Sequence, residues 1–158
     1  MEIKVLQNIL KVNDSIAEEN RRLFDQKKVL VIDLMSSPGA GKTTLLERTA
    51  ERLEGKLPFG VIEGDLATAA DAERVASHGV PVLQINTGKG CHLDAHQIQR
   101  ALDHFDLDAL DILFIENVGN LVCPAEFDLG QHTKVLLLST PEGEDKPEKY
   151  PVMFRQCP

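Results

Sequence analysis

One short segment limits what this 158-residue chain can fold into more than any other feature. An apolar run at residues 29–35 leads into a glycine-containing turn, and a helical pattern of apolar residues follows it. The turn reads Ser36-Ser37-Pro38-Gly39-Ala40-Gly41-Lys42-Thr43-Thr44. A buried strand, a turn ending in Gly-Lys-Thr and a helix are together typical of the phosphate-binding loop, whose usual pattern is G-x-x-x-x-G-K-[ST]. The segment therefore predicts a nucleotide-binding P-loop, with Ser36 at the position of the first glycine.

The residue types in this turn suit a nucleoside triphosphate. Gly39 and Gly41 allow backbone N–H groups to turn inward as an anion nest at the positive end of the following helix. Lys42 can reach the β- and γ-phosphates, and the Thr43 hydroxyl can ligate Mg²⁺. The alternative is a simple glycine turn in which Lys42 is solvated. We expect nucleotide contacts from Ser37, Pro38, Gly39, Ala40, Gly41, Lys42, Thr43 and Thr44.

The rest of the chain alternates short apolar runs with helical patterns. This alternation implies crossover connections, so the expected fold class is α/β, a mostly parallel sheet with helices on both faces, as in P-loop NTPases. Residues 1–25 predict an N-terminal amphipathic helix, broken near 13–15 where a helix could restart at a cap, and residues 26–158 form the P-loop domain. The proline-rich segment 140–151 is expected to be a surface loop. Further strands are predicted at 59–63, 80–85, 111–116 and 134–139, and helices at about 66–77 and 93–105.

Composition excludes several classes of function. The chain has 17 Lys and Arg against 25 Asp and Glu, a net charge of −8, and it lacks Trp. Binding to nucleic-acid phosphates needs clustered cations, and binding to single strands needs stacking aromatics, so nucleic acid is not the expected partner. No apolar run approaches the roughly 20 residues of a membrane helix, and the three cysteines do not make a disulfide framework. A reduced, cytoplasmic protein without a membrane partner is therefore expected.

Carboxylates follow two of the predicted strands, where open α/β sheets bind their ligands. Asp65 comes just after the second strand, and Glu116 ends the fourth. We expect Asp65 and Glu116 to hold Mg²⁺ together with Thr43, directly or through water, or to orient the attacking water. Asp71 is a weaker alternative. Carboxylates at strand ends are often helix caps instead, and that interpretation stays open here.

A second group of residues has the chemistry of a transition-metal site. Cys91 and His92 lie in a glycine-rich loop after the third predicted strand, and Cys123 lies in a loop after the fourth. Both loops are expected at the same edge of a parallel sheet, and thiolate and imidazole suit ions such as Zn²⁺ or Ni²⁺. His96, one helical turn beyond His92, could be a fourth ligand. An incomplete ligand set suits transfer of an ion, because an ion held by few ligands is easier to release. The alternative interpretation is that the cysteines are buried packing residues and the histidines are surface residues without a function.

The two sites together resemble a known family. The sequence is similar to the HypB-type nickel-incorporation GTPases, which assist maturation of nickel–iron hydrogenase. The match follows the family's order along almost the whole chain and includes the serine at the first P-loop position. The segments that carry it are 34–47, Glu63-Gly64-Asp65, Asn86-Thr87-Gly88-Lys89-Gly90-Cys91-His92-Leu93-Asp94-Ala95, Glu116-Asn117-Val118-Gly119-Asn120-Leu121-Val122-Cys123-Pro124 and 141–147.

The resemblance implies a SIMIBI-type G domain, shortened at its C-terminus, that acts as a slow, Mg²⁺-dependent GTPase and as a metallochaperone. It also implies homodimerisation driven by GTP, with the metal at or near the dimer interface, and other hydrogenase-maturation proteins as partners. The residues it implies are Cys91, His92 and Cys123 for nickel or zinc, Thr43, Asp65 and Glu116 for Mg²⁺, and Lys42, Asp65 and Glu116 for hydrolysis.

Two features depart from the family pattern. Some members carry a cysteine-rich or histidine-rich N-terminal extension that binds nickel. This sequence begins directly with the helical segment, so no second high-affinity nickel site is expected here. The family's guanine-reading Asn-Lys-x-Asp motif ends a strand that would follow 153–155, where this sequence has Gln-Cys-Pro at 156–158. The domain is therefore expected to be incomplete at its C-terminus, with one sheet edge unpaired.

Two other functions stay open at this point. A small-molecule P-loop kinase would use Cys91, His92 and Cys123 as ordinary packing residues and would bind no metal through thiols. A non-catalytic metal-binding fragment would bind metal without turning over GTP. Slow hydrolysis is the expectation for a GTPase because Arg48 and Arg74 lie within predicted helices rather than beside the γ-phosphate.

Overall fold

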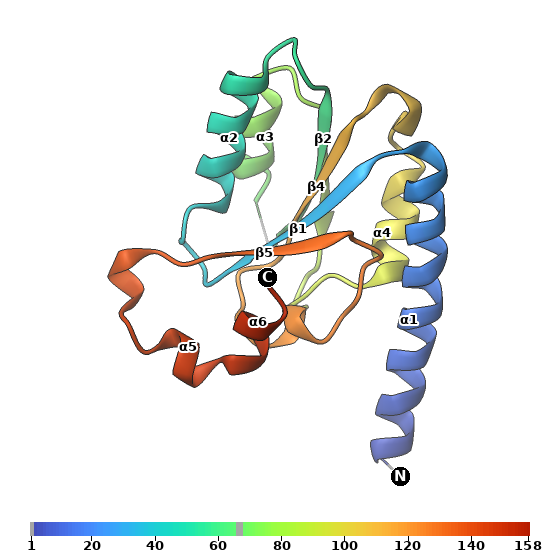
Figure 1. The fold of residues 1–158 in the computed structure, drawn as a ribbon, viewed down its shortest axis with the longest axis vertical. Helices are drawn as coiled ribbons and strands as arrows, with labels where there is room; N and C mark the ends of the chain where they lie inside the picture. Colours follow the sequence, from blue (N-terminus) through green and yellow to red (C-terminus); the bar gives the residue numbers. More distant parts are fainter. Residues whose placement is uncertain (1, 66–67) are drawn as a thin grey trace.

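The computed structural model describes residues 2–65 and 68–158, and side chains from residue 9 onward within them. In these residues, five strands alternate with helices along the chain (Figure 1). The strands are β1 Leu30–Ser36, β2 Phe59–Asp65, β3 Val82–Asn86, β4 Ile112–Glu116 and β5 Thr133–Leu137. The α-helices are α1 Glu2–Lys27, α2 Lys42–Leu53, α3 Ala70–Ala76, α4 Ala95–Leu102, α5 Lys146–Lys149 and α6 Pro151–Arg155.

All five strands are parallel and form one sheet in the order β3-β2-β4-β1-β5. Their carboxyl ends therefore meet at one edge of the sheet, where both candidate sites were expected. Pairing of β2 with β4 brings Glu63 opposite Glu116, and pairing of β1 with β4 brings Leu34 opposite Glu116. The predicted α/β class with a parallel sheet is confirmed.

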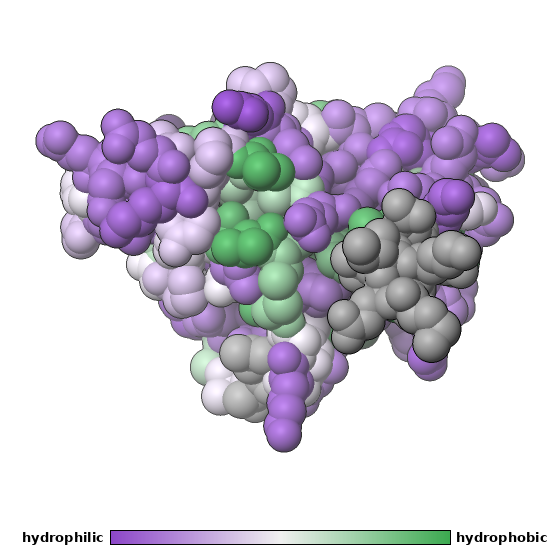
Figure 2. All heavy atoms as spheres, turned by 90° about the horizontal axis from the view of Figure 1, so that it is seen from below, coloured by the Kyte–Doolittle hydropathy of each residue, from purple (hydrophilic) through white to green (hydrophobic). Residues whose placement is uncertain are grey.

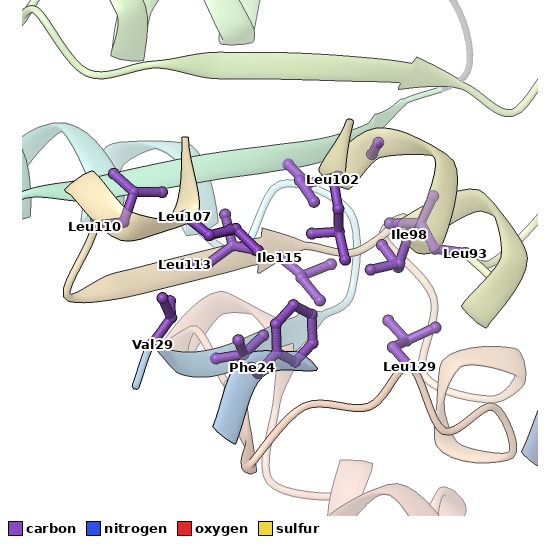
Figure 3. Close-up of a cluster of buried hydrophobic side chains, with 13 residues drawn as sticks. Phe24, Val29, Leu93, Ile98, Leu102, Leu107, Leu110, Leu113, Ile115 and Leu129 are labelled. Carbon is purple, nitrogen blue, oxygen red and sulfur yellow. The ribbon is translucent and has the colours of Figure 1, made fainter. Parts of the chain in front are cut away.

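Helices cover both faces of the sheet, as predicted (Figure 1). On one face, α2 and α3 pack over a cluster of buried residues that includes Leu46 and Val75. On the other face, α1 and α4 pack over a larger cluster that includes Phe24, Ile98 and Ile115 (Figure 3). Burial of this apolar area is the main force that holds the helices on the sheet.

The N-terminal helix α1 runs without interruption over 26 residues, so the expected break near 13–15 is wrong. Asn13 does not cap a new helix because its side chain is bonded elsewhere. Its Nδ2 donates to the Asp128 carbonyl oxygen at 2.8 Å, and its Oδ1 accepts from Ala95 N at 2.9 Å. Among the described residues, no helix combines the length and the apolar character needed to span a bilayer.

Most element boundaries differ from the predicted ones by a few residues. α3 begins at Ala70, and residues 66–67, where a helix was expected to start, lie outside the described part of the chain. α4 begins after Asp94, whose side chain caps its first turn. Segment 140–151 was predicted to be a surface loop but contains short helices, and Met153 just beyond it is fully buried. This C-terminal segment is therefore packed onto the domain rather than extended from it.

Candidate nucleotide and metal site

The turn between β1 and α2 has the geometry of a phosphate-binding loop. Gly39 and Gly41 have φ values of 76° and 106°, which residues with a Cβ disfavour, so glycine is needed at both positions. Gly41 is the N-cap residue of α2, and no side chain within residues 2–65 and 68–158 caps this helix end. The first N–H groups of α2 can therefore bind an anion at the positive end of the helix.

Lys42 and Thr43 are buried at the start of α2, although both are polar. Lys42 Nζ donates to Ser36 Oγ at 2.9 Å, and Thr43 Oγ1 donates to Glu116 Oε1 at 2.7 Å. Ser36 stands at the first position of the loop pattern, so this serine holds the lysine across the loop. Burial lowers the pKa of Lys42, and the charge of Glu116 opposes that shift. The two side chains predicted to bind phosphate and Mg²⁺ thus lie inside the loop.

Two buried carboxylates lie beside these residues. Glu63 and Glu116 pair across β2 and β4, and one oxygen of each (Oε2) is buried with no hydrogen-bond partner in the described part of the chain. Burial raises the pKa of Glu63 to about 8, with a further contribution from the charge of Glu116. Burial also raises the pKa of Glu116. Carboxylate oxygens without a partner, next to a threonine hydroxyl, are a donor set that Mg²⁺ prefers, so the residues present fit this ion.

Sequence reasoning selected Asp65 and Glu116 and passed over Glu63. Asp65 ends β2 and lies two positions after Glu63. Side chains two positions apart in a strand point to the same face, and this period is the signal that could have identified Glu63. Asp71, the weaker alternative, lies in α3, and its charge acts on Lys42 and on both glutamates. The acidic group beside the P-loop is therefore larger than predicted.

The structure brings Cys91, His92 and Cys123 together. Their candidate ligand atoms all lie within 4.8 Å of one another. The sulfurs of Cys91 and Cys123 are 2.8 Å apart as free thiols, and Cys91 Sγ lies 3.5 Å from His92 Nδ1. The first two residues come from the loop after β3, and Cys123 begins a short 3₁₀ turn, η2 (Cys123–Ala125), after β4. Two sulfurs and one imidazole form a partly buried donor set for a soft or borderline ion.

Protonation affects the two kinds of ligand in this cluster differently. Burial lowers the pKa of His92, so the neutral imidazole, which is the form that binds metals, predominates at neutral pH. The His92 ring also stacks on Phe127, with ring centroids 3.8 Å apart, and this contact orients the imidazole. The hydrogen bond from Cys91, together with burial, raises the pKa of Cys123. An ion must therefore displace a thiol proton when it binds.

His96 is not part of this cluster. α4 begins at Ala95, so His92 lies before the helix, and the i, i+4 spacing that would align it with His96 does not apply. The metal-capable group that the described residues form has three members and does not include His96. His132 also lies elsewhere, because its Nδ1 accepts from Val31 N at 2.9 Å. Neither His96 nor His132 therefore supplies a fourth ligand to the cluster in the described part of the chain.

The loop that carries Cys123 also contacts the P-loop. Asn120 N donates to the Ser36 carbonyl oxygen at 2.9 Å. Gly119 packs so closely on the P-loop that a Cβ at this position would lie 2.8 Å from Pro38 Cα. The loop of Cys123 and the P-loop are therefore in direct backbone contact.

The loop that carries His92 is connected to the end of β4. Asn117 directly follows β4, and its Oδ1 accepts from Leu93 N at 3.2 Å. Its Nδ2 donates to the buried carboxylate of Asp33 at 3.2 Å. Glu116, one residue earlier, accepts from the P-loop threonine. The end of β4 thus contacts the nucleotide site and one of the two metal loops through adjacent residues.

Comparisons with known proteins show the family to which the chain belongs. A family model described as the CobW/HypB/UreG nucleotide-binding domain matches residues 30–139. The hydrogenase maturation factor HypB of Azotobacter vinelandii is 57% identical over 96% of this chain and 50% of its own length. The probable hydrogenase maturation factor HypB of Methanocaldococcus jannaschii is 46% identical over 97% of this chain and 69% of its own length. The chain belongs to the HypB family.

A solved HypB structure gives the same result for the fold. The HypB of Helicobacter pylori, determined in complex with nickel, superposes with a TM-score of 0.87 at 46% identity, over 92% of this chain and 68% of the other. The resemblance to the HypB family and the P-loop NTPase fold are therefore confirmed. The chain spans about half the length of the curated HypB relative from A. vinelandii.

Proposed function

We propose that this chain is a GTP-binding and GTP-hydrolysing metallochaperone that binds nickel or zinc and delivers nickel during maturation of nickel–iron hydrogenase. The observation that carries the proposal is the cluster of Cys91, His92 and Cys123 on loops connected to the P-loop. The names of the HypB relatives and the nickel bound to the H. pylori protein support nickel as the cargo. A small-molecule kinase would give these three side chains no reason to converge.

In the proposed reaction the P-loop binds the phosphates of GTP. Lys42 exchanges its hydrogen bond to Ser36 for phosphate oxygens and stabilises the charge of the transferred phosphoryl group. Thr43, Asp65 and Glu116 would hold Mg²⁺, which when bound neutralises charge between the β- and γ-phosphates. Once Thr43 no longer donates to it, Glu116 can accept a proton or orient the attacking water. Lys42, Asp65 and Glu116 form the proposed catalytic set.

GTP-dependent homodimerisation would control access to the metal. Three ligands in one chain leave an ion with an open position, and a two-fold axis beside the cluster would supply further ligands from a second copy. Val122, next to Cys123, is a large apolar side chain that is 53% exposed. Figure 2, which views the molecule from below, separately shows apolar side chains near the centre of that face. Exposed apolar area of this kind supports a protein contact. Other cytoplasmic hydrogenase-maturation proteins would supply or receive the nickel.

Titration of the reduced chain with nickel and with zinc, with and without a non-hydrolysable GTP analogue, tests the proposal. We expect a thiolate-to-nickel absorption band and a nickel affinity that changes when the analogue is bound. Cys123→Ala should abolish the band. Cys157→Ala is the matched control, because it removes a half-buried free thiol outside the cluster and should leave the band intact. A band that persists in Cys123→Ala would exclude that sulfur from the site and contradict the proposal.

A further inference from the structure

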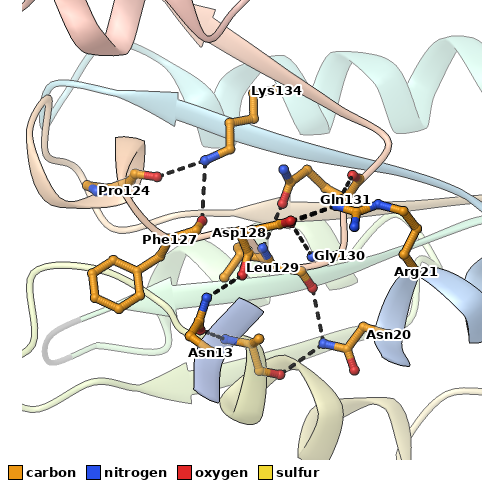
Figure 4. Close-up of polar contacts among 11 residues, drawn as sticks. Asn13, Asn20, Arg21, Pro124, Phe127, Asp128, Leu129, Gly130, Gln131 and Lys134 are labelled. Carbon is orange, nitrogen blue, oxygen red and sulfur yellow. Dashed lines mark hydrogen bonds and ion pairs between the residues drawn. The ribbon is translucent and has the colours of Figure 1, made fainter. Parts of the chain in front are cut away.

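Two buried asparagines of α1 bridge the segments on either side of the metal cluster. Asn13 is 6% exposed and Asn20 1%, and their seven-residue spacing places both on one face of the helix. Asn13 Nδ2 donates to the Asp128 carbonyl oxygen at 2.8 Å, and its Oδ1 accepts from Ala95 N at 2.9 Å. Asn20 Nδ2 donates to the carbonyl oxygens of Ala95 at 2.9 Å and Leu129 at 3.1 Å (Figure 4). Each amide therefore joins the same two segments.

Both bridged segments belong to the loops that carry the metal ligands. Ala95 begins α4, shortly after His92 at the end of the first ligand loop. Asp128 directly follows Phe127, whose ring stacks on the His92 imidazole. The same stretch of chain starts at Cys123, in η2. The two asparagines thus connect the loop of the imidazole ligand with the loop of the second thiol.

The turn after Leu129 is fitted to the backbone of α1. Gly130 has a φ of 92°, and a Cβ at this position would lie 2.6 Å from the Ala17 carbonyl oxygen. Arg21 Nη2 donates to both carboxylate oxygens of Asp128 at 2.8 Å (Figure 4). The ion pair does not involve the asparagines, and the close approach involves Asn20 only through its Cβ, so neither depends on the asparagine amides.

Lys134 anchors the second ligand loop from the side of the sheet. Its buried ammonium group donates to the carbonyl oxygens of Pro124 at 2.9 Å and Phe127 at 3.3 Å. The segment from Cys123 to Phe127 is therefore tied to β5. The asparagines of α1 connect the residues that follow this anchored segment with the start of α4, just after the Cys91–His92 loop.

We propose that Asn13 and Asn20 are positioning residues of the metal site, which set the separation of the two ligand loops so that metal affinity depends on how α1 is seated. The inference rests on the proposed metal-binding function. Removal of either amide leaves buried backbone groups without partners, so the two loops would move apart to reach water. Groups that orient metal ligands without touching the ion typically change metal affinity by about 10–100-fold when they are removed.

The test compares the nickel affinities of Asn13→Ala, Asn20→Ala and the double variant with that of the unchanged chain, followed at the thiolate-to-nickel absorption band. We expect the double variant to bind nickel about 10–100-fold more weakly and with an altered band. Its affinity for nucleotide without metal should stay the same. Val75→Ala is the matched control, because it truncates a buried side chain in the α2–α3 core, away from both ligand loops.

Unchanged nickel affinity and an unchanged band in the double variant would overturn the inference. An equal loss in Val75→Ala would also overturn it, because the loss would then reflect general destabilisation. If thermal unfolding shows that the double variant does not fold, the two single variants are compared under the same criteria. Failure of the proposed function is distinguishable, because the unchanged chain would then bind no nickel through Cys123.

Discussion

The P-loop and the metal cluster are two candidate sites of contrasting construction. The P-loop takes its residues from one continuous segment between β1 and α2, and its path follows from two glycines with positive φ. The metal cluster joins Cys91 and Cys123, 32 residues apart in sequence, and depends on α1 and β5 to hold the two loops. A local site is defined by its own backbone. An assembled site responds to changes in every element that supports it.

Lys42→Ala should have the largest effect, and the effect should be confined to the nucleotide site. Loss of the ammonium group that stabilises the transferred phosphoryl should reduce GTP hydrolysis by about 100-fold or more, measured as phosphate release with Mg²⁺. Sedimentation with a GTP analogue should show no nucleotide-linked dimer. Nickel affinity without nucleotide should equal that of the unchanged chain. A loss of nickel affinity there would break the distinction between the two sites.

Gly119→Ala should weaken the connection between the sites. The added methyl group would lie 2.8 Å from Pro38 Cα, so the two loops must separate, at a cost of about 1–3 kcal/mol in the free energy of unfolding. We expect nickel affinity without nucleotide to be retained and the effect of a GTP analogue on it to shrink. Thermal unfolding measures the cost, and paired nickel titrations measure the coupling. Coupling of unchanged size would mean that the sites communicate by another route.

Glu63→Gln should change the pH dependence of stability. Burial raises the pKa of Glu63 from 4.5 to about 8, so the folded state keeps a proton that the unfolded state loses, and the stability of the unchanged chain falls as pH rises across this interval. Glutamine has no charge to bury. The variant should therefore gain about 1–3 kcal/mol on the unchanged chain between about pH 5 and pH 8.

Thermal unfolding without Mg²⁺ or nucleotide, at both pH values, measures this difference. Two parallel pH profiles would contradict the raised pKa of Glu63. Parallel profiles would also mean that Glu63 does not belong to the group of buried carboxylates beside the P-loop.

His96→Ala should have the smallest effect on the metal site. Because His96 lies outside the cluster, nickel affinity should stay within about twofold of that of the unchanged chain. His92→Ala, titrated in parallel, is the matched control and should bind nickel much more weakly. A large loss in His96→Ala would extend the assembled site into α4.

The strands were the most predictable part of the fold. All five lie within two residues of the predicted limits at each end, because apolar runs between polar turn residues are local signals. The P-loop was equally predictable, since glycine at 39 and 41 and the following lysine and threonine act within one turn. The sequence also showed the residue types of the candidate metal site, but it left open whether the cluster has three ligands or includes His96 as a fourth.

Two of the predictions that failed depended on partners distant in sequence, and a third depended on a local helix cap. Asn13 resembles a helix cap in sequence, yet its bonds go to residues 82 and 115 positions away, and the helix continues through it. His96 seemed aligned with His92 until the structure placed the start of α4 between them. Glu63 was passed over because its closeness to Glu116 comes from strand pairing. The spacing of residues in the sequence does not show the partners of Asn13 or the pairing of β2 with β4, whereas the Asp94 cap and the two-residue strand period are local signals.

By itself the sequence determined a parallel α/β domain with a phosphate-binding turn and the thiols and imidazole of the candidate metal site. Backbone φ preferences and apolar periodicity act over a few residues, so such features can be recognised without a fold. Only the tertiary structure decided that Cys91 and Cys123 touch, that Glu63 and Glu116 share a buried site, and that α1 bridges both metal loops. Those contacts depend on the order of the strands and on the hydrogen-bond partners of buried amides. Both are determined by how the helices and the whole sheet pack together.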